Sequence, residues 1–444
     1  MFYEVKTRAI HDTSGLYSQG DITDRPCPAV TCGVGGLNSC HYKVEYYITD
    51  SPPLLPERTS LKPPYHVPDM SEIAALPWNG YNVISTFSGC GGSCLGFKMA
   101  GYRILWANEF IPAAQETYRV NHVGTILDTR DIREVQPEEI IEAIGGQEID
   151  VLEGSPPCAA FSTAGKREAG WGKVKKYSDT TQRVDDLFFE YARLLRGLQP
   201  KVFIAENVSG LVKGTAKGYF LEILAALKDC GYRVKAQVLD AQWLGVPQMR
   251  QRVIFQGVRD DLGLAPVYPK PLAYRYSVRE ALPWIVAVRK GEEFGHYRYD
   301  NASAAIADTI GTQSSSGNNK DNTAHTVEAE CDISRFAIGK EWAKIGAGGQ
   351  SDKYFQLTRP RLDGQSGTIT AEAGNARLAS VTHPTECRKF SIAELKRICA
   401  FPDDFILTGT YSQQWERLGR SVPPVMMFYI ARAVQEGVLD HVGK

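Results

Sequence analysis

Short apolar runs alternate with helix-like stretches from Tyr81 onwards, and this alternation constrains the fold more than any other feature of the chain. The runs cover residues 83–87, 103–107, 150–152, 201–205 and 253–255. Strands that alternate with helices build a parallel sheet with helices wound over both of its faces. We therefore predict an α/β fold with a doubly wound, mostly parallel sheet.

The alternation fades near residue 264 and returns near the end of the chain. Between residues 264 and 385, Gly, Ser, Thr and Asn dominate, with β-branched residues between them, which predicts a second, smaller, mostly β or irregular domain. Residues 76–263 and 386–444 would then be two parts of one sheet-based domain. In the second part, Ser391 and Glu394 have the spacing of a helix capping box.

The first 75 residues are irregular and rich in Pro and Gly, which predicts an accessory segment. Within residues 1–75, positions 24–31 resemble positions 363–370, although chance similarity explains this about as well. On that similarity we predict that the segment packs on residues 264–385.

The composition excludes several kinds of protein. The ten cysteines are scattered and form no disulfide framework. Cys27, Cys32, Cys40 and His41 match no familiar zinc site, so we expect no metal. No apolar run approaches the roughly 20 residues of a membrane span, and the N-terminus has no signal-peptide core. We expect a cytoplasmic or nucleoid-associated protein without a membrane partner.

The net charge of −1 does not by itself indicate a nucleic-acid binder. Basic side chains nevertheless gather in one stretch, opposed only by Glu168: Lys166, Arg167, Lys173, Lys175 and Lys176. A solvated loop and a phosphate-binding loop both explain this cluster.

A Gly-rich turn follows the first predicted strand and precedes a helix-like stretch. Its residues are Phe87, Ser88, Gly89, Cys90, Gly91 and Gly92. Glycines let a backbone approach a ligand closely, although tight-turn geometry alone also explains them. Glu109 ends the next strand, where a carboxylate would hold a ribose, and Asp131 lies where it could contact an adenine amine. Together these residues favour an adenosine-bearing cofactor.

A cysteine stands in a rigid proline loop just after another strand, in Gly154-Ser155-Pro156-Pro157-Cys158. The carboxyl edge of an open α/β sheet is where ligands bind. A buried structural cysteine is the alternative, but the Pro-Pro-Cys context favours a nucleophile, which needs a site that stabilises the thiolate.

Two further motifs end or begin strands. Glu206-Asn207-Val208 would place a carboxyl group in the same pocket as Cys158, unless Glu206 is only a cap or surface acid. Gln248, Arg250 and Arg252 would share one strand face by period-2 alternation, which suits a polar ligand or an exposed amphipathic strand.

These four motifs, in this order, resemble the cytosine-5 DNA methyltransferase family. The resemblance covers about residues 76–262 and 386–440, and it includes the closing motifs at positions 401–405 and 419–424. The intervening stretch corresponds to the family's variable target-recognition domain. The resemblance implies an enzyme with S-adenosylmethionine as donor and double-stranded DNA as substrate. A monomer with a partner restriction endonuclease, in a bacterial, archaeal or phage-infected cell, would fit it.

The resemblance also implies roles for individual residues. Cys158 would attack carbon 6 of a flipped-out cytosine, Glu206 would hold or protonate ring nitrogen 3, and Arg252 would bind the carbonyl oxygen, with Arg250 supporting the loop. The donor would be held by Phe87, Ser88, Gly89, Gly91, Gly92, Glu109, Phe110, Asp131, Ser155, Pro157, Arg420, Ser421 and Val422. DNA would be contacted by Ser162, Lys166, Arg167, Lys173, Lys175, Lys176 and Gln248.

Two residues depart from the family pattern. Ser85 stands where Asp is frequent, and Arg420 stands where Asn is nearly invariant. An arginine beside a sulfonium donor needs an anion, which could be a protein carboxylate, a DNA phosphate or a carboxylate on the donor itself. Carboxy-S-adenosylmethionine is therefore a second candidate donor, with 5-carboxymethylcytosine as product. The motifs are also compatible with an RNA cytosine methyltransferase or with an inactive DNA-binding module.

Overall fold

The computed structural model describes four long segments of the chain and four isolated strands. The segments are residues 62–157, 186–212, 217–285 and 329–442. The strands are β1 (Tyr3–Ile10), β2 (His41–Ile48), β7 (Val174–Lys176) and β8 (Thr181–Arg183). β7 and β8 pair with each other. The expectation that Cys27, Cys32, Cys40 and His41 bind no zinc concerns side chains outside the described residues.

Nine strands form one sheet in the order β2-β1-β10-β11-β9-β6-β3-β4-β5. The central seven are β3 (Asn82–Thr86), β4 (Arg103–Asn108), β5 (Ile126–Asp128), β6 (Val151–Gly154), β9 (Val202–Val208), β10 (Tyr232–Asp240) and β11 (Gln251–Arg259). Parallel pairing joins β5, β4, β3, β6 and β9, whereas β11 runs antiparallel between β9 and β10. The predicted α/β fold is confirmed, and the antiparallel end is an addition to it.

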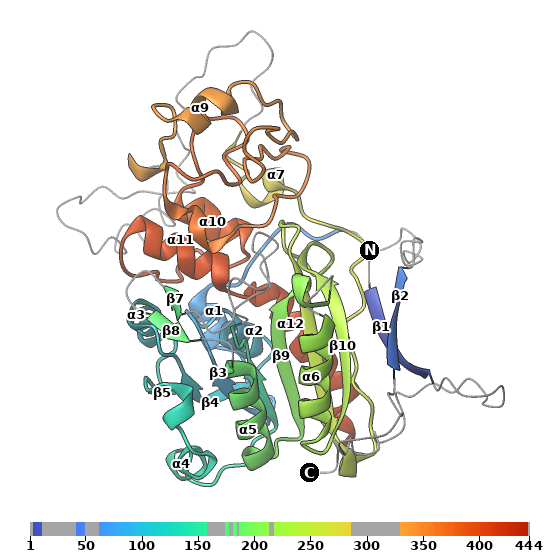
Figure 1. The fold of residues 1–444 in the computed structure, drawn as a ribbon. Helices are drawn as coiled ribbons and strands as arrows, with labels where there is room; N and C mark the ends of the chain where they lie inside the picture. The colour runs from blue at the N-terminus through green and yellow to red at the C-terminus, as the bar shows by residue number, and fades with distance from the viewer. Residues whose placement is uncertain are drawn as a thin grey trace.

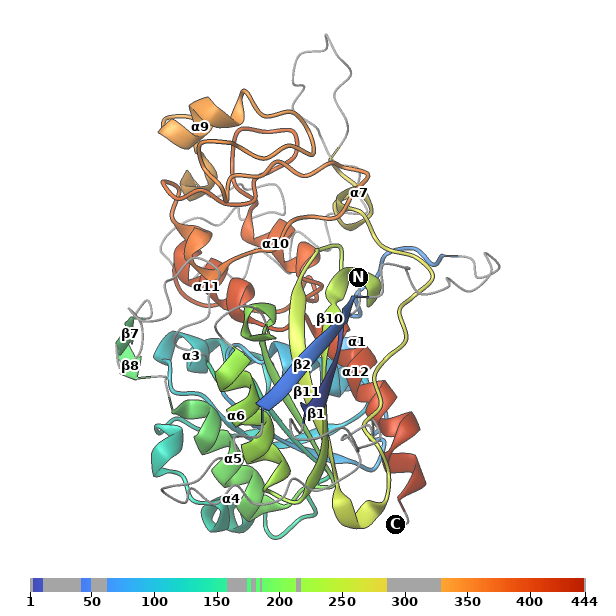
Figure 2. The same ribbon diagram turned by 45° about the vertical axis from the view of Figure 1, so that its right-hand side comes forward.

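Helices cover both faces of the sheet because neighbouring strand residues point to opposite sides. Val83 packs with α2 and α12, while Ile84 packs with α5 and α6 on the other face (Figures 1 and 2). The helices around the sheet are α1 (Met70–Ala74), α2 (Gly92–Met99), α3 (Pro112–Asn121), α4 (Pro137–Ala143), α5 (Leu187–Leu198), α6 (Lys217–Lys228) and α12 (Pro424–Gly437). This three-layer arrangement leaves the carboxyl edge of the parallel strands for a site.

The N-terminal strands do not lie where the sequence similarity predicted. β1 pairs antiparallel with β10, through Tyr3 opposite Val238, and so extends the nine-stranded sheet rather than the second domain. The predicted packing of the accessory segment on residues 264–385 is wrong for these strands. Among the described residues of the segment, contact with residues 264–385 occurs near residue 62, where Lys62 pairs with Glu280 and the Pro63 carbonyl accepts a hydrogen bond from Tyr276.

An irregular upper lobe, residues 329–385, stands above the carboxyl edge of the sheet (Figure 1). It contains α9 (Ala337–Trp342) and a hydrophobic cluster of its own around Trp342 and Leu357. α7 (Val278–Ala281), α10 (Ile392–Ile398) and α11 (Tyr411–Arg420) lie between this lobe and the sheet. In the described part of the lobe, β pairing is limited to isolated bridges, so "irregular" describes it better than "mostly β".

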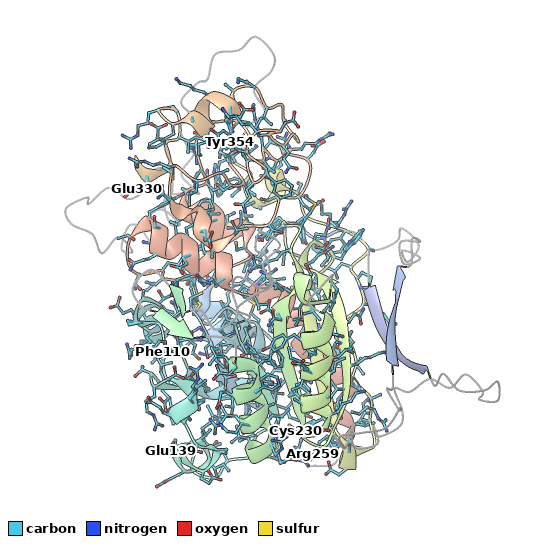
Figure 3. All side chains as sticks on the ribbon, viewed as in Figure 1. Phe110, Glu139, Cys230, Arg259, Glu330 and Tyr354 are labelled. Carbon is cyan, nitrogen blue, oxygen red and sulfur yellow. The ribbon has the colours of Figure 1, made fainter. Side chains whose placement is uncertain are left out.

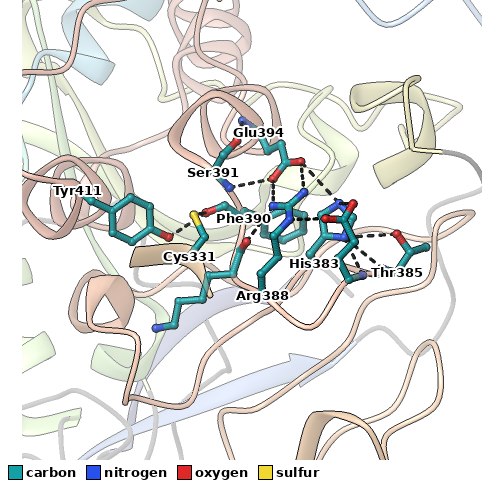
Figure 4. Close-up of polar contacts among 10 residues, drawn as sticks. Cys331, His383, Thr385, Arg388, Phe390, Ser391, Glu394 and Tyr411 are labelled. Carbon is teal, nitrogen blue, oxygen red and sulfur yellow. Dashed lines mark hydrogen bonds and ion pairs between the residues drawn. The ribbon is translucent and has the colours of Figure 1, made fainter. Parts of the chain in front are cut away.

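Buried polar contacts lie where the upper lobe meets the start of α10, near the boundary predicted at residue 385, and include His383 Nε2 at 3.5 Å from Glu394 Oε1. Arg388 donates to both carboxylate oxygens of Glu394, at 2.7 and 2.8 Å, and Cys331 donates to the Phe390 carbonyl (Figure 4). Ser391 and Glu394 form the predicted capping box. Cys331 near the start of the lobe and His383 near its end therefore both lie against the segment that begins α10.

The described helices include none that is both long enough and apolar enough to span a membrane.

Candidate functional site

The Gly-rich turn joins β3 to α2 in a strained, left-handed backbone. Phe87, Gly89 and Gly91 have φ angles of 54°, 58° and 88°, a region that favours glycine. A Cβ on Gly92 would lie 2.5 Å from the Val422 carbonyl oxygen. Glycine is therefore required at position 92 because the chain closing over the turn leaves no room for a side chain.

Glu109 holds the turn from the neighbouring strand. Its Oε2 accepts a hydrogen bond from the Gly89 amide at 2.6 Å, and its Oε1 accepts one from the Ile111 amide at 2.7 Å. Burial raises the pKa of Glu109, and the backbone bonds and the charges of Arg417 and Arg420 oppose that rise. The carboxylate is therefore placed beside the turn, as predicted for a ribose-binding acid.

The other predicted donor residues lie on the same edge. Phe110 follows Glu109 on the side of the sheet that faces the upper lobe, whereas Cys230 and Arg259 lie at the opposite end (Figure 3). Asp131 caps a short helical turn after β5, accepts a hydrogen bond from the Arg133 amide and pairs with that side chain.

The end of α11 covers the turn. Ser421 packs its Cβ against Gly92, and its hydroxyl donates to the Arg417 carbonyl at 2.9 Å. Arg420 donates to Glu416 Oε1 at 2.8 Å. A protein carboxylate therefore meets the Arg420 charge, which is one of the three anions considered from the sequence.

The predicted catalytic carboxyl, Glu206, and the predicted base-binding arginine, Arg252, lie on adjacent strands. Arg252 on β11 places its Nε 2.6 Å from Oε1 of Glu206 on β9, and both side chains are largely buried. Asn207 donates to the Pro156 carbonyl at 3.0 Å, which ties this strand end to the loop carrying Ser155 and Pro157. These bonds place Glu206 and Arg252 beside the chain that leads directly into Cys158.

Cys158 itself and the predicted DNA-contacting loop lie outside the described side chains. The same is true of Ser162, Lys166, Arg167, Lys173, Lys175 and Lys176. Their roles stay predictions.

Gln248 and Arg250 do not lie on the strand face that the sequence predicted for them. β11 begins only at Gln251, so the period-2 argument does not reach either residue. Gln248 is fully buried, and its amide meets Cys399 and the Ile369 backbone, which corrects its assignment as a DNA contact. Arg250 donates to the carbonyls of Ile369, Gly419 and Ser421, and so joins the segment around Ile369 to the end of α11.

A buried acid that the sequence analysis missed lies beside the turn. Glu153 on β6 accepts a 2.6 Å hydrogen bond from Ser85, the residue that replaces the frequent aspartate of the family. Ser85 also exchanges a hydrogen bond with Ser88 in the turn. Burial raises the pKa of Glu153 to about 7, hydrogen bonds from Ser85 and Ser93 oppose this, and Glu206 adds to it. The sequence signal that could have revealed this acid is its position directly after the apolar residues Val151 and Leu152, within the same strand.

Glu153 should make the stability of the protein depend on pH. Its pKa is raised from 4.5 to about 7, so between these values the folded protein keeps a proton that the unfolded chain has lost. The free energy of unfolding should therefore fall as pH rises through this window, by at most roughly 3 kcal/mol. Glu153→Gln should remove this decrease in the free energy of unfolding between pH 4.5 and about 7. Urea unfolding of both proteins from pH 5 to 8 measures it, and parallel curves would contradict the assignment.

The residues of the turn fit an adenosine-bearing sulfonium donor. Glu109 offers a carboxylate for hydroxyl groups. Buried nitrogens of Arg417 in α11 have no hydrogen-bond partner among the described residues, so they can serve a ligand. The described residues show no His, Cys, Asp and Glu cluster of the kind that holds a metal ion.

Comparisons with known proteins agree with this arrangement. Residues 81–436 match the family described as C-5 cytosine-specific DNA methylase. The chain is 30% identical over 357 residues to the Type II methyltransferase M.NgoFVII of Neisseria gonorrhoeae, covering 80% of this chain and 87% of that protein. It is 31% identical over 359 residues to the Type II methyltransferase M.Sau96I of Staphylococcus aureus, covering 80% and 75%.

Solved structures share the fold. A protein described as a DNA modification methyltransferase encoded within an Escherichia coli prophage gives a TM-score of 0.58 at 22% identity, covering 81% of this chain and 100% of that chain. A DNMT2 mutant of Spodoptera frugiperda gives 0.51 at 18% identity, covering 80% and 100%. At these identities the likeness concerns the fold alone.

Proposed function

Because the chain belongs to the C-5 cytosine-specific DNA methylase family, we propose that it methylates carbon 5 of cytosine in DNA through a covalent adduct with Cys158. The chain is a DNA (cytosine-5-)-methyltransferase similar to Type II enzymes. One observation carries the finer proposal: the Asn207–Pro156 hydrogen bond brings the Glu206–Arg252 pair beside the loop that leads into Cys158.

The proposed reaction begins when the Cys158 thiolate adds to carbon 6 of a cytosine turned out of the duplex. Glu206 holds or protonates ring nitrogen 3, and Arg252 binds the carbonyl oxygen, so the ring accepts the electron pair. The donor would supply a sulfonium-bound methyl group, which carbon 5 would take with the electron pair of the ring while the thioether S-adenosylhomocysteine leaves. Loss of the carbon 5 proton would then re-form the double bond between carbons 5 and 6, break the bond between carbon 6 and sulfur, and free Cys158 as its thiolate.

Double-stranded DNA is the proposed substrate. The basic residues from Lys166 to Lys176 would neutralise phosphates, and the upper lobe would read base edges. The expected setting is a cytoplasmic monomer with a partner restriction endonuclease.

Methyl transfer is favoured over carboxymethyl transfer because Arg420 already meets Glu416. Transfer from carboxy-S-adenosylmethionine would need Arg420 to leave that carboxylate for one on the donor. This choice can be tested together with the substrate.

Nucleoside mass spectrometry should find 5-methylcytosine in DNA after incubation with the purified chain and equal amounts of both donors. Transfer RNA in a parallel reaction should stay unmodified, and Arg420→Asn should not change the ratio of the two products. Modification of RNA alone, or no modified cytosine at all, would contradict the proposed function. A carboxymethyl product that Arg420→Asn suppresses would instead identify the carboxylated donor.

A further inference from the structure

Arg417, on the inner side of α11, is a buried cation that the reaction as proposed does not use. Only 3% of its surface is exposed. Its Nη2 lies 3.1 Å from Glu416 Oε2, but at an angle that makes no hydrogen bond, and Nε also lacks a hydrogen-bond partner among the described residues. Buried guanidinium groups ordinarily have their N–H donors satisfied, because leaving them unpaired is costly.

The Arg417 residue lies against the donor turn. Its backbone carbonyl accepts hydrogen bonds from the Ser421 amide and hydroxyl, and the Cys90 thiol approaches the same oxygen at 3.9 Å. Burial raises the pKa of both Glu109 and Cys90, and the Arg417 charge opposes the rise in each case. The positive charge of Arg417 therefore favours the ionised forms of Glu109 and Cys90, which lie beside and within the turn.

Arg417 keeps N–H donors that no described residue satisfies, although carboxylates lie near it. Arg417 and Arg420 both form ion pairs with the carboxylate of Glu416, and both charges also act on Glu109. Glu109 already receives two backbone hydrogen bonds from its own strand end and the turn. An anionic group of a ligand would satisfy the Arg417 donors that the protein does not.

We propose that Arg417 binds the α-carboxylate of the methionine part of S-adenosylmethionine. The proposal rests on the proposed function for the identity of the donor. Besides its sulfonium and ammonium cations this donor has a single carboxylate, and a guanidinium can bind it with two parallel, charge-assisted hydrogen bonds. Glu109 would hold the ribose hydroxyls of the same molecule, so the turn would lie between the two contacts.

Isothermal titration of the full chain with two ligands tests this assignment. The ligands are S-adenosylmethionine and its decarboxylated form, which lacks only the α-carboxylate. The wild-type protein should bind the first at least about tenfold more tightly, as expected for a charge-assisted contact. Arg417→Gln should weaken the binding of S-adenosylmethionine by about that factor and leave the affinity for the decarboxylated ligand unchanged. The two affinities should then converge. Arg417→Lys, which keeps the charge, should retain part of the difference.

Arg432→Gln is the control, because it removes an exposed arginine of α12 that pairs with Glu436 and should preserve the ratio of the two affinities. Equal weakening of both ligands by Arg417→Gln would show a structural role and overturn the proposal. A wild-type ratio near one would overturn it without any variant. A wild-type protein that binds neither ligand would refute S-adenosylmethionine as the donor, and with it the proposed function.

Discussion

Replacing Cys158 with serine is expected to abolish methyl transfer while DNA binding persists. A hydroxyl is a far poorer nucleophile than a thiolate near neutral pH, so the addition to carbon 6 should not occur at a measurable rate. The loop should keep its position, since Asn207 holds it through the Pro156 backbone rather than through the thiol. Transfer of labelled methyl groups and a gel-shift titration measure the two properties.

The covalent step can be observed directly with DNA that contains 5-fluorocytosine. Fluorine cannot leave carbon 5 as a proton does, so the wild-type protein should stay attached to this DNA on a denaturing gel. Cys158→Ser should give no such complex. Substantial turnover by the serine variant would mean that Cys158 has a structural role only.

Replacing Glu206 with glutamine is expected to lower the turnover rate by at least about 100-fold, in line with typical general acid contributions. The amide keeps the shape of the carboxyl group and can still accept the hydrogen bond from Arg252, which lies at 2.6 Å in the native pair. The loss would therefore reflect the missing proton at ring nitrogen 3 rather than a displaced strand. Single-turnover rates between pH 5 and 9 measure it.

Glu153→Gln is the matched control for this variant. It also removes a buried acid from a neighbouring strand, but its partner is Ser85 rather than Arg252. We expect it to lower the turnover rate by much less than Glu206→Gln. A Glu206→Gln variant with the rate and pH profile of the wild type would remove this residue from the mechanism.

The strands that carry the site were predictable because each buries both of its faces. Runs at 83–87, 103–107 and 201–205 correspond to β3, β4 and β9, and each ends at a residue of the site. β10 was missed although Tyr232 to Asp240 alternates buried and exposed positions at its start, the pattern of a strand with one covered face. Its pairing with β1 also places the N-terminal strand on the sheet, and a weak local similarity could not have revealed a backbone contact.

Side-chain direction was the part of the site that the sequence could not provide. The positions of Glu206 and Arg252 were inferred from strand ends, but their ion pair depends on β11 running antiparallel to β9. Gln248 looks polar and accessible in the sequence, yet the returning segment around Ile369 buries it. Arg417 acquires its position only when α11 folds over a turn that lies more than 300 residues earlier, as its 327-residue separation from Cys90 shows.

That separation has a consequence for how the enzyme is made in the cell. The turn at Gly92 and the helix α2 leave the ribosome long before α12, although Gly96 packs against Pro424 and Tyr102 donates to the Ala431 carbonyl 329 positions later. At about 5–20 residues per second, the delay is roughly 15–65 s. During that time one face of the sheet lacks its covering helix, so a nascent chain needs protection from aggregation. It also lacks the α11 segment that covers its donor turn, and the enzyme should gain the ability to modify DNA only once α11 and α12 have been synthesised.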